Sequence, residues 1–340
     1  MQKDYHYYAV YQLAKLAGFS PTDAGTIAYS SQYTDDSTES EPVKPFPDQH
    51  FDTVRTAHYN LEAFCWDVQK KIFMPFHFLP AKIRRESPSS FSYITQVATG
   101  NNGELATKLV KDALSEENAT LRLIRLGVAL HTVVDTFSHF GFSGRHHDEN
   151  DVEGVQLEKS AVGCNSQTFK SYISRVADIL FPRIGHVEAL DFPDLPYMKW
   201  QYTDHGGNKN PRNNVGYSIM GAKLLYRFLK MAWSGSGSTV NLEKDHPKDF
   251  KEMKRLFEQN GDLEARCKKW KSYTSAPKYC RTKWRKDALK GDVAWDELSP
   301  SVLKTHLSKL EGKAGFDNSK WAYFHRAAAR QRSLVVDWLN

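Results

Sequence analysis

The stretch LRLIRLGVALHTVVDTFSHFGF, residues 121–142, contributes most to the fold prediction. Its apolar residues recur at spacings of three and four, which is the pattern of an α-helix. His131, Asp135 and His139 interrupt the apolar surface at intervals of four residues. Because four residues turn a helix by about 400°, these three side chains are expected on one face.

This polar triple predicts metal binding. A lone histidine on an apolar helix is usually a hydrogen-bonded core residue, and an Asp–His pair four residues apart is often a weak surface pair. An aspartate buried among apolar side chains without a cation is costly, however. Along a straight helix the two histidines lie about 12 Å apart, whereas metal–nitrogen bonds are about 2 Å long. We therefore expect more than one ion, with Asp135 between them.

The rest of the chain also shows mainly helical patterns. Residues 5–18 form an apolar helical repeat that is expected to end at Gly18, and Ser20 with Pro21 is expected to begin the next helix. Residues 191–214, with their prolines and adjacent glycines, are expected to form a loop. The predicted fold is an all-α multi-helix bundle.

A short glycine-serine stretch suggests two parts. SGSGS at 234–238 is the best linker candidate. It would separate a metal-binding helical catalytic domain, residues 1–233, from a basic helical carboxy-terminal lobe, residues 239–340, packed on it.

Composition gives the broad class. With 340 residues, 40% hydrophobic and 25% charged, the chain resembles a soluble globular protein. Its net charge of +6 favours anionic partners such as phosphate esters, nucleic acid or acidic membrane surfaces. Neither an apolar signal core nor a membrane-length apolar window is found, so we expect a cytoplasmic protein, or one exported without a cleaved signal peptide. The oligomeric state stays open.

The cysteines argue against a cysteine zinc site, because none of the four forms a CxxC pair. Whether Cys267 and Cys280 form a disulfide stays open. Other residues that could complete a metal site are histidines and carboxylates spread over the first two thirds of the chain: Asp4, His6, Asp35, Asp36, His58, His77 between prolines, His147, Asp151, His186, Glu188 and Asp194.

The order of these residues resembles a known superfamily. An amino-terminal His, an acidic residue, a second His, and then HxxxD on an apolar helix with a further His, is the ligand order of the zinc-dependent phospholipase C and single-strand-specific nuclease superfamily. More narrowly, TAHYN, PFHFLP and ALHTVVDTFSHFGFSG look like an uncharacterised bacterial and fungal family distantly similar to that superfamily. The resemblance covers roughly the first two thirds of the chain.

The resemblance implies an all-α fold with a three-zinc cluster. Asp35 or Asp36 would bind one zinc with His58, His131 and Asp135. Asp135 would bridge to a second ion bound by His6. In the superfamily that ion also takes the free amino group of a processed amino terminus, for which Asp4 could substitute here. His139 would bind a third ion with His186 and either Glu188 or Asp194, or else with His147 and Asp151.

The predicted function is zinc-dependent hydrolysis of phosphate esters, as by a phospholipase C-like phosphodiesterase. Two or three zinc ions are expected, with manganese or iron as alternatives, and Asp35 or Asp36 would orient the attacking water. The substrate would be an anionic phosphate ester, either a lipid head group approached at a membrane surface or a nucleotide. The alternatives are a single-strand nuclease-like phosphodiesterase, a metallohydrolase of another ester or amide, and a non-catalytic interaction or toxin-delivery protein with structural zinc.

Overall fold

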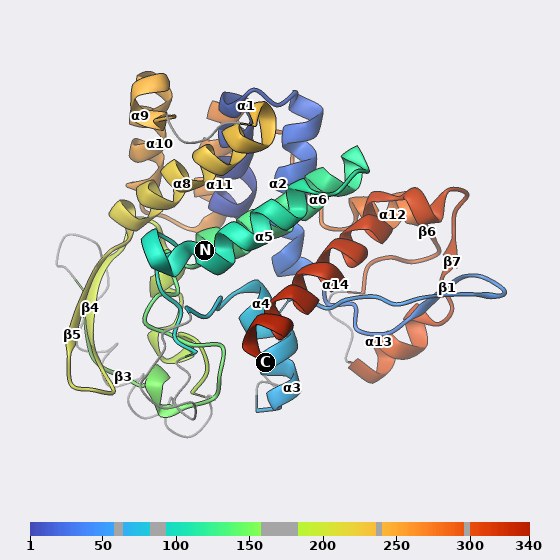
Figure 1. The fold of residues 1–340 in the computed structure, drawn as a ribbon, viewed down its shortest axis with the longest axis horizontal. Helices are drawn as coiled ribbons and strands as arrows, with labels where there is room; N and C mark the ends of the chain where they lie inside the picture. The colour runs from blue at the N-terminus through green and yellow to red at the C-terminus, as the bar shows by residue number, and fades with distance from the viewer. Residues whose placement is uncertain (58–63, 82–92, 158–182, 236–239, 296–299) are drawn as a thin grey trace.

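The structure, a computed structural model, describes residues 1–57, 64–81, 93–157, 183–235, 240–295 and 300–340 (Figure 1). Helices account for 59% of it and strands for 11%, in three small antiparallel sheets. The prediction of an all-α fold is therefore wrong, because the fold combines α-helices with β-sheets. None of the described helices is long and apolar enough to cross a membrane.

The α-helices are α1 (Val10–Ala17), α2 (Pro21–Asp36), α3 (Trp66–Val68), α4 (Met74–Phe76), α5 (Glu104–Leu114), α6 (Ala119–Asp135), α8 (Asn214–Ser234), α9 (Leu242–Asp245), α10 (Pro247–Phe257), α11 (Leu263–Thr274), α12 (Lys283–Ala288), α13 (Pro300–Leu307) and α14 (Lys320–Leu339). Two π-helical segments, η1 (Asp4–Ala9) and η3 (Gln69–Phe73), precede α1 and α4. Short 3-10 turns are η4 (Gly100–Gly103), η5 (Asp148–Asn150), η6 (Val187–Ala189), η7 (Phe192–Asp194) and η8 (Phe316–Asn318).

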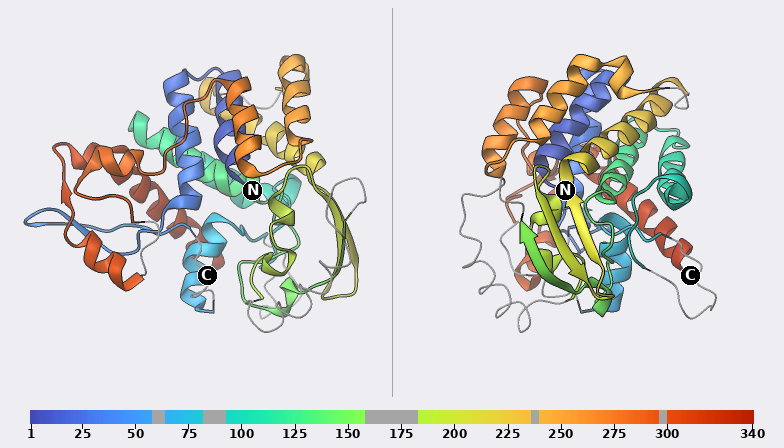
Figure 2. Two further views of the ribbon diagram at one scale, coloured as in Figure 1. Left: turned by 180° about the vertical axis from the view of Figure 1, so that it is seen from behind. Right: turned by 90° about the vertical axis from the view of Figure 1, so that its left-hand side faces the viewer.

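The strands form two two-stranded antiparallel sheets, β1–β2 and β6–β7, and one three-stranded sheet. They are β1 (Val43–Phe46), β2 (Gln49–Phe51), β3 (Val152–Leu157), β4 (Lys199–Asp204), β5 (Lys209–Asn213), β6 (Leu289–Lys290) and β7 (Glu311–Gly312). The sheet β3–β4–β5 lies at one end of the molecule, and β1, β6, β7 and α13 lie at the other (Figures 1 and 2).

The sheet corrects the loop predicted for residues 191–214. Within β4, Trp200 and Tyr202 are buried, whereas Lys199 is exposed and Gln201 is half-buried. This alternation is the period of a half-buried strand. The adjacent glycines form the turn of the β4–β5 hairpin, where Asp204 Oδ1 accepts hydrogen bonds from the backbone N–H groups of Gly206 and Asn208. The glycine-rich turn therefore stabilises the hairpin.

Helix α6 runs through the core, packed against α2, α5, α8 and α14. Its crossing with α2 depends on Gly127, where an added Cβ would lie 2.4 Å from the carbonyl oxygen of Ile27. The predicted boundaries around α1 and α2 are confirmed. Gly18 ends α1 in the left-handed conformation, and the Ser20 hydroxyl accepts from the backbone N–H of Asp23.

The end of α6 differs from the prediction. The helix ends at Asp135, so His139 does not continue a straight helix. The next residues form tight turns, in which the backbone N–H groups of Phe137 and Ser138 donate to carbonyls three residues back. The turns change the direction of the chain, so the 12 Å helical spacing between His131 and His139 does not apply.

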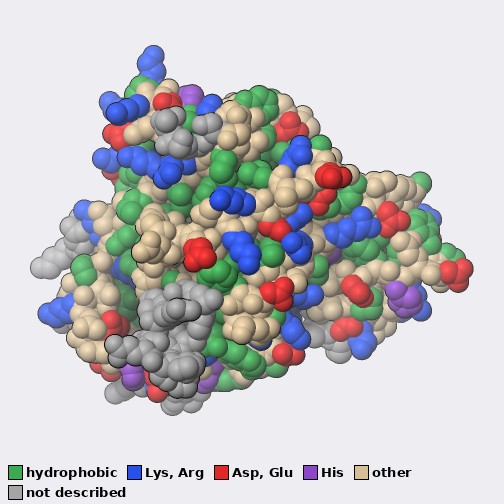
Figure 3. Space-filling view, in the orientation of Figure 1, with side chains coloured by type: hydrophobic (Ala, Val, Ile, Leu, Met, Phe, Trp, Pro, Cys, Tyr) green, Lys and Arg blue, Asp and Glu red, His purple; other side chains and the backbone are tan. Residues whose placement is uncertain are grey.

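The carboxy-terminal residues share the main hydrophobic core. That core includes Tyr33 of α2 together with Trp321 and Phe324 of α14. A fully buried ion pair joins Glu39 to Arg285 at 2.8 Å. The linker candidate lies mostly outside the described residues, since 236–239 are not among them. On the face drawn in Figure 3, basic and acidic side chains are interspersed.

The cysteines that the structure describes are free thiols. Cys267 is buried, while Cys65 and Cys280 are exposed. Cys267 and Cys280 therefore do not form a disulfide.

Candidate metal centre

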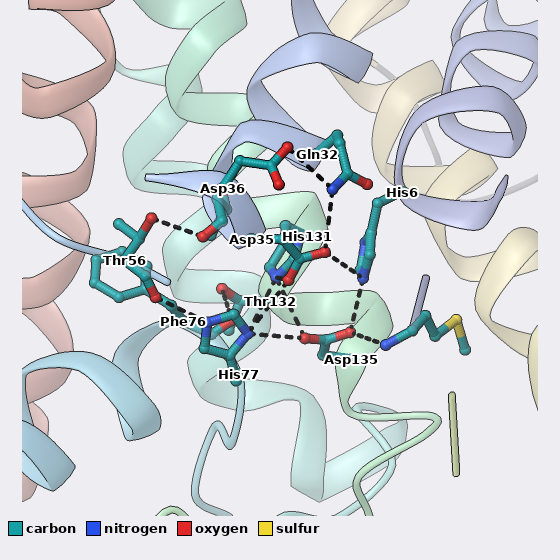
Figure 4. Close-up of polar contacts among 12 residues, drawn as sticks. His6, Gln32, Asp35, Asp36, Thr56, Phe76, His77, His131, Thr132 and Asp135 are labelled. Atoms are coloured by element: carbon teal, nitrogen blue, oxygen red, sulfur yellow. Dashed lines mark hydrogen bonds and ion pairs between the residues drawn. The ribbon is translucent and has the colours of Figure 1, made fainter. Parts of the chain in front are cut away.

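Five side chains from four separate segments meet beside the end of α6 (Figure 4). His131 and Asp135 come from α6, His6 from η1, and Asp35 from the last turn of α2. His77 follows directly after α4. The close α2–α6 crossing at Gly127 and the π-helical winding of η1 bring these segments together, and π-helical turns occur frequently at functional sites.

A first donor group comprises Asp35 Oδ1, His77 Nδ1, His131 Nε2 and Asp135 Oδ2. Five of the separations between these atoms run from 3.3 to 3.8 Å. Two atoms that each lie about 2.1 Å from one ion at a tetrahedral angle are about 3.4 Å apart. His77 Nδ1, His131 Nε2 and Asp135 Oδ2 therefore have the mutual spacing of tetrahedral ligands, and Asp35 Oδ1 lies beside both histidine nitrogens.

A second donor group forms on the other side of the same two carboxylates. His6 Nε2 lies 3.1 Å from Asp135 Oδ1 and 3.9 Å from Asp35 Oδ2. The Met1 amino nitrogen lies 2.7 Å from Asp135 Oδ1. Each carboxylate thus presents one oxygen to the first group and the other oxygen to the second, as a bridging ligand would.

A third donor group comprises His139, His186 and Asp194. His139 Nε2 is 3.0 Å from Asp194 Oδ1, and His186 Nε2 is 3.3 Å from Asp194 Oδ2. The Met1 amino nitrogen lies 2.8 Å from Asp194 Oδ1, between the second and third groups. His139 Nδ1 also lies 3.8 Å from Asp135 Oδ2, so the three groups adjoin one another.

Backbone carbonyls orient three of the histidines. His77 Nε2 donates to the Thr56 carbonyl, His139 Nδ1 to the His77 carbonyl, and His186 Nδ1 to the Leu190 carbonyl, each at 2.8 Å. Because a carbonyl only accepts, the ring nitrogen facing it must carry the proton. When each ring is neutral, its other nitrogen offers a lone pair on the side of the carboxylates, which is the usual arrangement around metal-binding histidines.

Some nitrogens of the centre lack partners. Both ring nitrogens of His6 and Nδ1 of His131 are buried without a hydrogen bond to any described residue. The contact between His6 and Asp135 is close but does not have hydrogen-bond geometry. A buried polar atom without a partner costs about 1–3 kcal/mol. A cation coordinated by His6 Nε2 would remove part of that cost, so the residues present fit a metal ion.

The pKa values of the centre depend on burial and on positive charge beside the carboxylates. Burial lowers the pKa of His6 to about 3, and burial also lowers the pKa of His139. Burial raises the pKa of Asp35 well above its usual value. For Asp135, burial acts in the same direction, but the Met1 ammonium and nearby histidines outweigh it and hold the pKa well below its usual value. Asp35 and Asp135 are thus adjacent carboxylates whose pKa values shift in opposite directions, which is typical of a site that binds positive charge.

The structure places five further predicted ligands away from the centre. Asp36 turns from it, its carboxylate accepting from the Tyr279 hydroxyl at 2.6 Å. Asp4 pairs with Arg266 at 2.8 Å, so the Met1 nitrogen, and not Asp4, lies beside Asp135.

The remaining candidates also lie elsewhere. Glu188 accepts from the backbone N–H of Val152. His147 is exposed, and Asp151 pairs with Arg183 at 3.2 Å. His58 lies outside the described residues. The structure thus brings together His6, Asp35, His77, His131, Asp135, His139, His186 and Asp194.

The sequence offered His77 as one of several further candidates, and the resemblance raised a free amino group for which Asp4 was offered as a substitute. The prolines on both sides of His77 were a usable signal, because they fix the local backbone. A backbone amino group has no side-chain pattern, so spacing arguments could not find it.

The chain belongs to a family of unknown function (DUF6765), whose model matches residues 1–339. No curated protein and no solved structure is detectably similar to it.

Proposed function

We propose that this protein is a metal-dependent hydrolase of phosphate esters. The observation that carries the proposal is the set of three adjoining donor groups, in which Asp35 and Asp135 each present their two oxygens to two different groups. Eight buried or half-buried histidines and aspartates in one place serve no evident packing purpose, since apolar residues would fill the space at lower cost.

Nitrogen and oxygen donors without thiolates suit zinc, with manganese or iron as alternatives. Divalent cations in such a cluster supply acidified water at neutral pH and positive charge for phosphoryl oxygens. In the first group the ligands would be Asp35, His77, His131 and Asp135. His6 would serve the second group, and His139, His186 and Asp194 the third.

Asp35 is the best candidate for orienting the attacking water. Its side chain is 26% exposed, compared with 1% for Asp135. A carboxylate at the edge of the centre can accept a proton from an incoming water, while a buried one can only bind and balance charge. Asp36, the other residue predicted for this role, is already hydrogen-bonded to Tyr279.

The aromatic residues bear on the substrate. Trp270 and Trp284, which the nuclease alternative would use to stack bases, are buried in the core. Phe76, Phe78 and Phe142 are also buried. None of these rings is available to a base or to a lipid chain. The proposed substrate is therefore defined only by its phosphate ester group.

The test is hydrolysis of bis(4-nitrophenyl) phosphate by the purified chain. We expect activity that requires zinc or manganese, is lost with chelator, and falls by at least about a hundredfold in Asp135→Asn and His131→Gln. His147→Gln, an exposed histidine outside the centre, is the matched control and should match the wild type.

Two outcomes would contradict the proposed hydrolase function. Bound metal without hydrolysis of any ester or amide would favour the structural-zinc alternative, in which ions only join helices. Hydrolysis that survives both substitutions would exclude the centre as the catalyst.

A further inference from the structure

Arg212 on β5 is a buried cation without a carboxylate partner. Its side chain is 4% exposed and lies opposite Trp200 on the neighbouring strand. Its Nη2 donates to the Phe140 carbonyl and, at 3.2 Å, to the Tyr202 hydroxyl. Within the described part of the chain, no aspartate or glutamate forms an ion pair with it.

The other buried arginines of the described residues are different. Arg266 pairs with Asp4 and Arg285 pairs with Glu39, each at 2.8 Å. Only Arg212 among these three is left with aromatic neighbours alone, its guanidinium 3.4 Å above the Phe140 ring centre. A cation–π contact offsets only part of the cost of burying a charge.

Part of the Arg212 guanidinium remains available to a ligand. Its Nε has no hydrogen-bond partner in the described structure but is enclosed by the protein, so it is not among the donors that a ligand can reach. Its Nη1 makes no hydrogen bond with a described residue either. Arginine presents its N–H groups as a planar fork that matches the oxygens of carboxylates and phosphates. The unused donors therefore favour an oxyanion.

A cavity of about 630 Å³ adjoins this arginine. Its lining combines cationic, amide and apolar groups, namely Lys199, Trp200, Arg212, Asn213, Tyr217 and Met220. Helix α8, of 21 residues, begins at Asn214 beside the cavity. The amino-terminal end of a helix carries partial positive charge and favours anions. The volume suits a small organic molecule.

We propose that this cavity binds a small organic oxyanion, with its phosphate or carboxylate group at Arg212 and the start of α8 and its apolar part against Tyr217 and Met220. The site is separate from the three donor groups and does not depend on the proposed hydrolase function. Inorganic phosphate, phenyl phosphate and benzoate distinguish the two anion types and the contribution of the apolar part.

The experiment is calorimetric titration of the metal-free full chain, dialysed against chelator so that the metal centre cannot contribute. We expect saturable binding of phenyl phosphate or benzoate, tighter than that of inorganic phosphate. Met220 is 44% exposed, so Met220→Glu and Met220→Gln should both fold. The new carboxylate in Met220→Glu should weaken binding by about tenfold or more, while Met220→Gln should resemble the wild type.

Arg212 is tested directly as well. Arg212→Met should abolish binding, and Arg212→Lys should weaken it, because an ammonium lacks the planar fork. The proposal is overturned if no probe binds the metal-free chain, or if Met220→Glu and Met220→Gln bind equally well. The second comparison remains decisive even if Arg212→Met fails to fold. Loss of the hydrolase activity alone would leave this proposal standing.

Discussion

At the scale of single residues, Asp135 holds the centre together. One of its oxygens faces His77 and His131, and the other faces His6 and the Met1 nitrogen. A residue that serves two donor groups should affect both when it changes. The neighbouring side chains are fixed by packing and by backbone carbonyls, so they cannot easily move to replace it.

We therefore predict that Asp135→Asn lowers the bound metal by more than one ion per chain. The amide removes the negative charge that both groups share. Elemental analysis of the purified protein measures the loss. Asp151→Asn is the matched control, because Asp151 pairs with Arg183 away from the centre. Equal metal content in the two variants would contradict a bridging role.

Chelation should also lower the stability of the wild type. Ligands that bind only the folded state stabilise it by mass action, by about 2.7 kcal/mol at a free concentration one hundred times Kd. Thermal unfolding with and without chelator measures the shift, which we expect to be several degrees. In Asp135→Asn the shift should be smaller. An unchanged melting temperature in the wild type would mean that no ion is bound.

A second residue-scale prediction concerns Glu39. Burial raises the pKa of this carboxyl group, but the adjacent Arg285 outweighs burial and lowers it to about 2. Because the folded-state pKa lies below the ordinary value of 4.5, the pair stabilises the fold above that value. The stabilisation is lost as the pH falls from about 4.5 through 2.

Glu39→Gln should therefore lower the free energy of unfolding at pH 7 by about 3–5 kcal/mol, since it removes the negative charge that faces the buried Arg285 guanidinium. The variant should also lose the part of the acid dependence between pH 4.5 and 2. Urea unfolding at several pH values measures both effects. Glu41→Gln is the control, because Glu41 is only half-buried and contacts Lys304 loosely at 3.9 Å.

At the scale of elements, the distance between α2 and α6 sets the geometry of the first donor group. An added Cβ at Gly127 would lie 2.4 Å from the Ile27 carbonyl oxygen and 2.6 Å from Ser30 Cβ. Gly25, also in α2, has much more room, because an added Cβ there would meet nothing closer than 3.9 Å.

We predict that Gly127→Ala pushes the two helices apart, costs about 1–3 kcal/mol of stability, and weakens metal binding by separating Asp35 from His131. Gly25→Ala should instead stabilise the protein by about 0.5–1 kcal/mol, because alanine is the better helix residue. Denaturant unfolding and metal titration of both variants provide the comparison. Equal metal affinity would show that the crossing does not control the centre.

Sequence patterns predicted some of the helices and strands correctly and missed others. The 3.6-residue periodicity located α6, and the capping residues located the ends of α1 and α2. The turn after Asp135 could not be predicted, because the apolar pattern continues through Phe137 while the backbone direction changes. The β4–β5 hairpin was missed because its exposed positions are polar and its turn is rich in glycine, so composition outweighed a short alternation of Trp200 and Tyr202.

The metal ligands, too, could be predicted only in part from the sequence. Residue type and spacing proposed the histidines and aspartates of the centre, but only tertiary structure separates Asp35 from Asp36, or Asp194 from Glu188. The members of each pair are close in sequence and similar in chemistry. Their different roles follow from which way the backbone turns each side chain and from partners such as Tyr279, which is distant in sequence.

At the scale of the whole molecule, the carboxy-terminal helix supports the centre. Gln331 on α14 donates to the Thr132 hydroxyl at 2.7 Å and to the Pro75 carbonyl at 2.9 Å. Thr132 follows His131, and Pro75 lies two residues before His77. The predicted carboxy-terminal lobe therefore contacts the Thr132 side chain and the Pro75 carbonyl, each next to a segment that supplies a histidine of the first donor group.

We predict that the chain unfolds in one cooperative transition. The main hydrophobic core contains residues from both predicted parts, so neither buries its apolar surface alone. Tryptophan fluorescence, to which Trp295 and Trp321 contribute, and far-UV circular dichroism should give coincident curves. An earlier transition seen by one probe only would indicate an independent carboxy-terminal unit.

The support that α14 gives to the ligand segments has a consequence for biosynthesis. His6 and Asp35 are synthesised before His131 and His139, and α14, which contacts Thr132 and the Pro75 carbonyl, is synthesised after all four. A nascent chain would therefore expose half-assembled histidine and aspartate sites throughout translation. If the centre binds metal as we propose, the first donor group is braced only after α14 has been synthesised and packed, so the supply of free metal at that stage would affect how the protein matures.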